Sequence, residues 1–87
     1  MRRPIVKTLL DLTQDEARAY LRLAAGDELD AAVALAFDRN VLEGNSKAPD
    51  ETEVHHALFL LRRACGLEAP SFDAMRVQLR ARRTLAA

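Results

Sequence analysis

Apolar residues recur at helical spacing along most of this chain, and four breaks divide them into five segments. The spacing predicts helices over residues 5–12, 14–25, 28–42 and 50–65, and a fifth from residue 71 onward. Helix-start signals agree, because Thr13 and Glu16 have the spacing of a capping box and Ser71 precedes the last segment. Gly26 and Gly66 end two of the segments. β-branched residues are few and never alternate with polar ones, so the sequence predicts an all-α protein.

The fourth predicted helix, with Asp50 or Thr52 as its N-terminal cap, is apolar around much of its circumference. Phe59 and Leu60 widen a main face that consists of Val54, Ala57, Leu58, Leu61, Ala64 and Cys65. Such a helix is either enclosed in the core or exposes part of its surface to a partner. From the sequence, burial, a partner groove and the seam of a homodimer all stay open.

The composition fits a single small domain. The chain has 87 residues, 49% of them hydrophobic, and 13 basic residues balance 13 acidic ones. We expect one domain over 1–87, with a three-helix bundle over 4–43, a linker over 44–49 and a two-helix extension over 50–87. No apolar run approaches the ~20 residues that span a bilayer. The lone Cys65 excludes an intramolecular disulfide and suits a reducing compartment, so we expect a cytoplasmic protein, or a nuclear one in a eukaryote.

The sequence offers little catalytic chemistry. His55 and His56 are adjacent, so on a helix they point about 100° apart and cannot chelate one metal together. Paired cysteines, a His-Glu-x-x-His motif and a Gly-rich phosphate loop are all missing from the sequence. We therefore predict a protein that is not an enzyme and that needs neither a metal nor a cofactor.

Residues 4–40 carry a pattern of short motifs at defined spacing. In chain order these are the loop Leu10-Asp11-Leu12, the cap Thr13, the pair Ala17 and Leu21, the turn Gly26-Asp27, and the small-residue helix from Asp30 to Phe37. This pattern resembles the ubiquitin-associated domain, particularly its relatives in ubiquitin-regulatory-X adaptor proteins and messenger-RNA export receptors. The resemblance implies a compact three-helix bundle, although the family usually has Gly where this chain has Asp11.

The same resemblance implies a surface for ubiquitin, made by the first loop and the end of the third helix. Carried over by position, its residues are Leu10, Asp11, Leu12, Leu35, Phe37 and Asp38. An apolar contact of this kind is smaller than the ~1,200 Å² of standard interfaces, so binding would be weak and transient. The alternative is that these apolar residues close the core. Of Leu35 and Phe37, one can face inward while the other faces outward.

The last predicted helix suggests a second function. Arg76, Arg80 and Arg83 form a basic stripe on the face away from Phe72, Met75 and Leu79. The stripe would suit an adaptor or regulatory protein that binds an acidic protein or nucleic acid. Such a protein could come from a bacterium. Zero net charge and the lack of interleaved aromatic residues weaken the nucleic-acid interpretation. A solvated helix face is the simpler alternative.

Overall fold

The computed structural model describes residues 12–45 and 47–86, and this part of the chain contains four α-helices and no strand. The helices are α1 (Gln14–Leu23), α2 (Glu28–Leu42), α3 (Glu51–Ala64) and α4 (Phe72–Ala86). The all-α prediction is confirmed, and each of these helices matches a predicted one. The helix predicted over 5–12 lies outside the described residues. None of the four helices combines the length and hydrophobicity that crossing a bilayer requires.

Capping boxes begin α1 and α3. The Thr13 hydroxyl accepts a hydrogen bond from the Glu16 amide at 3.1 Å, and the Glu16 carboxylate accepts one from the Thr13 amide at 3.0 Å. Asp50 and Glu53 make the same exchange at 2.8 and 3.0 Å. Asp50 rather than Thr52 is therefore the cap of α3, because its carboxylate satisfies an amide that the helix leaves unpaired.

Helix α1 ends two residues before the predicted boundary at residue 25. The amide of Ala25 donates to the Arg22 carbonyl at 3.1 Å, and the amide of Gly26 donates to the Leu21 carbonyl at 2.7 Å. These two bonds are those of a Schellman motif, which closes a helix through a residue in the left-handed region. That residue is Ala25, with φ of 53°, followed by Gly26 at 85°.

The core lies where α1, α2 and α3 meet. Its largest fully buried side chains include Tyr20 from α1, Leu35 from α2 and Leu61 from α3. The buried residues of α2 include three alanines, whose small side chains let neighbouring helices approach it closely. Among the residues whose burial the structure describes, the buried apolar ones are Ala17, Tyr20, Leu29, Ala31, Ala32, Leu35, Ala36, Val54, Ala57, Leu58, Leu60, Leu61, Met75 and Leu79.

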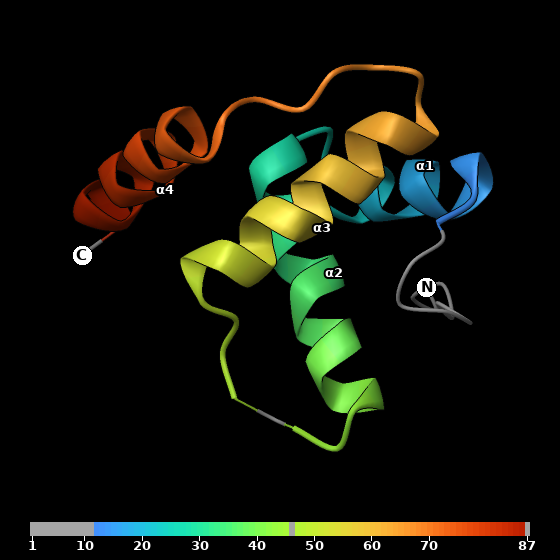
Figure 1. The fold of residues 1–87 in the computed structure, drawn as a ribbon, viewed down its shortest axis with the longest axis horizontal. Coiled ribbons are helices and arrows are strands. Elements are labelled where there is room, and N and C mark those ends of the chain that lie inside the picture. The colour runs from blue at the N-terminus through green and yellow to red at the C-terminus, as the bar shows by residue number, and fades with distance from the viewer. Residues whose placement is uncertain (1–11, 46, 87) are drawn as a thin grey trace.

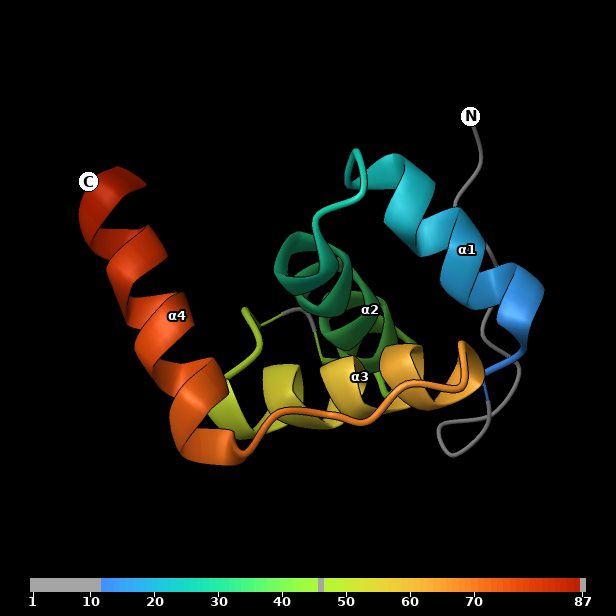
Figure 2. The same cartoon turned by 90° about the horizontal axis from the view of Figure 1, so that it is seen from above.

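Helix α3 is the fourth predicted helix, and its wide apolar surface is mostly buried. Of burial, a partner groove and a homodimer seam, burial therefore applies to most of this surface. Leu58, Leu60 and Leu61 are all buried, and only Phe59 remains exposed, at 40%. Two sides of α3 are covered. Helix α2 packs across one side, and the segment that connects α3 to α4 runs along another (Figures 1 and 2).

Helix α4 packs mainly against α3, at one edge of the molecule (Figures 1 and 2). After α3 the linker 65–71 runs back alongside that helix, so α4 begins near the N-terminal end of α3 (Figures 1 and 2). Met75 and Leu79 are buried on its inner side. His55 of α3 fixes the start of α4, because its Nε2 lies 3.0 Å from the Pro70 carbonyl and its ring meets Phe72 edge-on at 5.5 Å. Since a carbonyl only accepts, this Nε2 carries the hydrogen.

Candidate functional site

Four of the six residues of the expected ubiquitin surface belong to the described part of the chain, and their side chains differ in exposure. Leu10 and Asp11 lie outside the described residues. Leu12 is partly buried and packs against the core. Leu35 is completely buried, so in this structure it is a core residue and does not reach a partner. Asp38 is half-buried and accepts a hydrogen bond from the Tyr20 hydroxyl at 2.6 Å.

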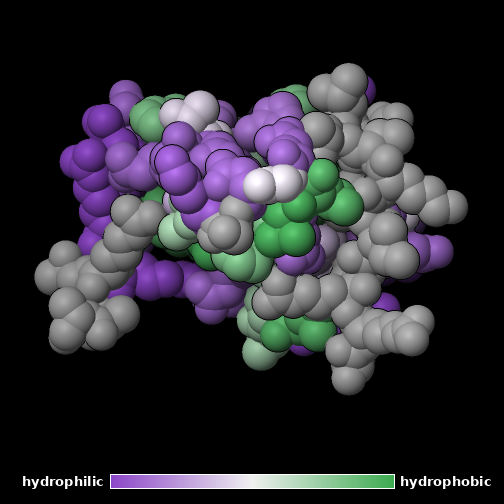
Figure 3. Space-filling model, turned by 90° about the horizontal axis from the view of Figure 1, so that it is seen from below, coloured by the Kyte–Doolittle hydropathy of each residue, from purple (hydrophilic) through white to green (hydrophobic). Residues whose placement is uncertain are grey.

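Phe37 is the one expected surface residue of α2 whose side chain is well exposed, at 37%. Val41 follows one helical turn later and is 51% exposed. Residues four apart lie next to each other on a helix, so Phe37 and Val41 form a small apolar surface, which we call the α2 outer patch. Figure 3 views the molecule from the side on which α2 ends, and hydrophobic residues gather there among hydrophilic ones.

The arginines of α4 bind acidic residues of this same chain. Arg80 contacts both carboxylate oxygens of Glu51, at 3.2 and 3.4 Å. Arg76 pairs with Asp73 at 3.3 Å and its guanidinium lies over the ring of Phe72. The side chain of Arg83 lies outside the described part of the structure. The predicted basic stripe is therefore at least partly engaged within the molecule.

Arg82, which the sequence does not single out, makes the most extensive of these contacts. It donates to both carboxylate oxygens of Asp27, at 2.9 and 2.7 Å, and to Asp30 at 2.5 Å. Asp27 caps α2, so Arg82 ties α4 to the start of α2. The hydrogen bond from Arg82 is the main cause that lowers the pKa of Asp27, and the same contact raises the pKa of Arg82. The side chains are partly exposed, so we expect these ion pairs to contribute little to stability.

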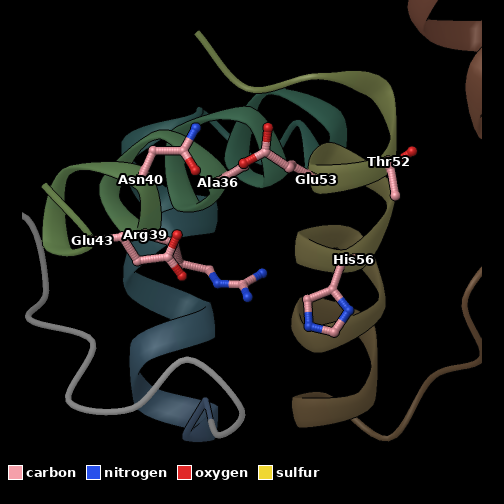
Figure 4. A pocket seen from close by; sticks show the side chains of 7 residues that line it. All are labelled: Ala36, Arg39, Asn40, Glu43, Thr52, Glu53 and His56. Carbon is pink, nitrogen blue, oxygen red and sulfur yellow. The ribbon is translucent and has the colours of Figure 1, made fainter. Parts of the chain in front are cut away.

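A cleft opens between the second half of α2 and the first half of α3. Its volume is about 390 Å³, and its lining residues are Ala36, Arg39, Asn40, Glu43, Thr52, Glu53 and His56. In Figure 4 the guanidinium of Arg39 and the ring of His56 extend into this cleft from opposite helices. Asn40 is 2% exposed and donates to the Lys47 carbonyl at 3.3 Å, which ties Lys47 to the second half of α2.

Two features of the cleft are electrostatic. The Nε atom of Arg39 is buried and has no hydrogen-bond partner in the described part of the chain. The pKa of His56 is lowered, first by burial, then by the positive charge of Arg39 and last by His55. The sequence gives no sign of this pairing, because Arg39 and His56 belong to different predicted helices and neither lies in a recognisable motif.

Metal binding finds no support among residues 12–45 and 47–86, where no group of three His, Cys, Asp or Glu residues is arranged to hold an ion. His55 contacts Pro70 and Phe72, whereas His56 faces the cleft and stacks near Phe59 with ring centres 6.5 Å apart. The two histidines therefore point to different surroundings, as their adjacent positions on a helix predict. Cys65 is partly buried against the core.

Lowering the pH should destabilise the protein through His56. The unfolded side chain takes up a proton near pH 6.5, whereas the folded one does so at lower pH. Between these two values the unfolded state binds more protons, so the free energy of unfolding falls as the pH drops and is unaffected well above 6.5. Urea unfolding at pH 7.5 and 5.5 measures this loss, which His56→Gln should reduce. An identical loss in the variant would show that other groups cause it.

No family model matches this sequence, and no curated protein or solved structure matches it either.

Proposed function

We propose that this chain is a non-catalytic protein-interaction module that binds its partner through the α2 outer patch, Phe37 and Val41. The observation that carries the proposal is the exposure of these two side chains, 37% and 51%, on a helix whose opposite side forms the core. An amphipathic surface helix normally presents polar residues to water. Apolar residues that are neighbours on the outer side of a packed helix are typical of a contact surface.

We further propose that the module is of the ubiquitin-associated type and that its partner is ubiquitin. Support comes from the order of elements, since α1, the Gly26-Asp27 turn and α2 correspond to the second half of the family pattern. Phe37 also occupies a position that the resemblance assigns to the binding surface. The patch would dock against the hydrophobic patch of ubiquitin. A contact built around two side chains supports only weak, rapidly exchanging binding.

Phe37→Ala should abolish most of the binding. Truncating a central aromatic side chain removes the largest apolar area of the patch, and such residues dominate small interfaces. The test is an NMR titration of the isotope-labelled chain with monomeric ubiquitin up to about 1 mM, a concentration suited to weak complexes. The wild-type chain should show saturable amide shifts near Phe37 and Val41, and the variant should need at least about tenfold more ubiquitin.

Val77→Ala is the matched control, because Val77 is apolar and 68% exposed but lies on α4. This variant should bind ubiquitin as the wild type does. If the wild-type chain shows no shifts, ubiquitin is not the partner. If shifts appear but cluster on α4 and survive Phe37→Ala, the α2 outer patch is not the binding surface, and the Arg-rich helix becomes the better explanation.

A further inference from the structure

Arg39 differs from the other half-buried arginines of the described chain. Arg62, Arg76 and Arg82 each contact a carboxylate, Glu28 at 2.5 Å in the first case. Arg39 is equally half-buried, yet no ion pair to it is present among the described residues and its Nε is buried without a hydrogen-bond partner. A partly buried charge normally has a counter-charge, because desolvation without one is costly. An anion would supply the counter-charge that Arg39 lacks among the described residues.

The space in front of Arg39 suits such an anion. The cleft of about 390 Å³ lies within the usual size range of small-molecule sites, about 300–1,000 Å³. Across it stands the imidazole of His56 (Figure 4). Guanidinium groups bind carboxylates and phosphates through two parallel hydrogen bonds, and the end of the Arg39 guanidinium extends into the cleft (Figure 4).

Two acidic residues also line the cleft, and they affect Arg39 differently. Glu53 is engaged elsewhere, since its carboxylate accepts the hydrogen bond from the Asp50 amide at 3.0 Å. Glu43 lies at the C-terminal cap of α2 and makes no ion pair with Arg39 in the structure as described. Glu43 is thus the natural competitor of an external anion, and neutralising it should strengthen binding.

We propose that the cleft between α2 and α3 is a binding site for a small oxyanion, a carboxylate or phosphate group, held by the Arg39 guanidinium with His56 as a second donor. The site is separate from the α2 outer patch and does not rest on the proposed binding of ubiquitin. The bound group neutralises the buried guanidinium and also favours protonation of His56, whose charged neighbours are Arg39 and Glu43 from α2 and Glu53 and His55 from α3.

The proposal is tested by NMR titration of the full chain, following the Arg39 Nε–H signal and the His56 ring proton. The probes are glutamate blocked at both backbone ends and, in a separate series, inorganic phosphate, each at ionic strength matched with sodium chloride. We expect saturable shifts of both signals and a higher titration midpoint for His56. Saturation by the blocked glutamate identifies a carboxylate source, and saturation by phosphate alone identifies a phosphate source.

Variants make the test specific. Arg39→Gln should weaken binding at least about tenfold, because it removes a charge-assisted hydrogen-bond donor. Arg18→Gln, an exposed arginine of α1, should leave binding unchanged, and Glu43→Gln should strengthen it. His56→Gln provides a second loss variant should Arg39→Gln not fold. Equal binding by the loss variants, or weak shifts spread evenly over all arginines, would mean an adventitious ion only and would overturn the proposal.

Discussion

Leu35→Ala should lower the free energy of unfolding by about 2–5 kcal/mol, the range for removing a large buried side chain and leaving a cavity. Leu35 has 0% exposure at the centre of α2, so little neighbouring structure can move into the space. A domain of this size is stabilised by only about 5–15 kcal/mol in total, so the variant would be partly unfolded under mild conditions. Urea unfolding followed by circular dichroism measures the change.

Val41→Ala is the control on the same helix. Val41 is 51% exposed, and alanine has the higher helix propensity, so we expect a loss of at most about 1 kcal/mol. A Leu35→Ala variant as stable as this control would contradict the described orientation of α2. In that case Phe37 rather than Leu35 would face the core, and the α2 outer patch would not exist.

Met75→Ala should release α4 while α1, α2 and α3 stay folded. Met75 is completely buried and, with Leu79, is one of the two buried apolar side chains over residues 72–82 of α4. Its truncation costs about 2–5 kcal/mol, a large share of the free energy that holds one short helix in place. The remaining contacts are those of Leu79 and Phe72 with the core and partly exposed ion pairs such as Arg82 with Asp27, which contribute little.

Hydrogen exchange resolved by residue measures this release. Amides of α4 should lose protection in Met75→Ala, whereas those of α2 and α3 keep theirs, because parts of a protein can open separately. Val77→Ala, on the exposed side of α4, should leave every helix protected. Loss of protection along the whole chain in Met75→Ala would show that α4 and the other helices fold as one cooperative unit.

The helices were predictable from the sequence because their signals are local. Thr13 with Glu16 and Ser71 before α4 mark helix starts through contacts three residues apart, and the structure contains those contacts. The prediction placed the end of α1 at residue 25, two residues too late. The helix ends earlier because Ala25 itself adopts the left-handed conformation, which glycine adopts more readily. Local rules describe the backbone conformation that each residue type prefers. At Ala25 the hydrogen bonds that close α1 outweigh the preference of alanine for other conformations.

The arrangement of side chains between helices was not predictable. Helical spacing shows that Leu35 and Phe37 face different ways, but α2 is apolar on nearly every side, so the pattern does not show which one is buried. The pairing of Arg82 with Asp27 joins residues 55 positions apart, and the approach of Arg39 to His56 depends on how two helices cross. Such contacts follow from tertiary packing, about which single-residue preferences carry no information.

The return of the linker along α3 has a consequence for where opposite charges meet in the molecule. It brings α4 beside the starts of α2 and α3, whose first turns carry acidic residues. Arg82 there contacts Asp27 and Asp30, and Arg80 contacts Glu51. The carboxylates that complement the positive ends of two helix dipoles are therefore themselves balanced by arginines from the last helix of the chain.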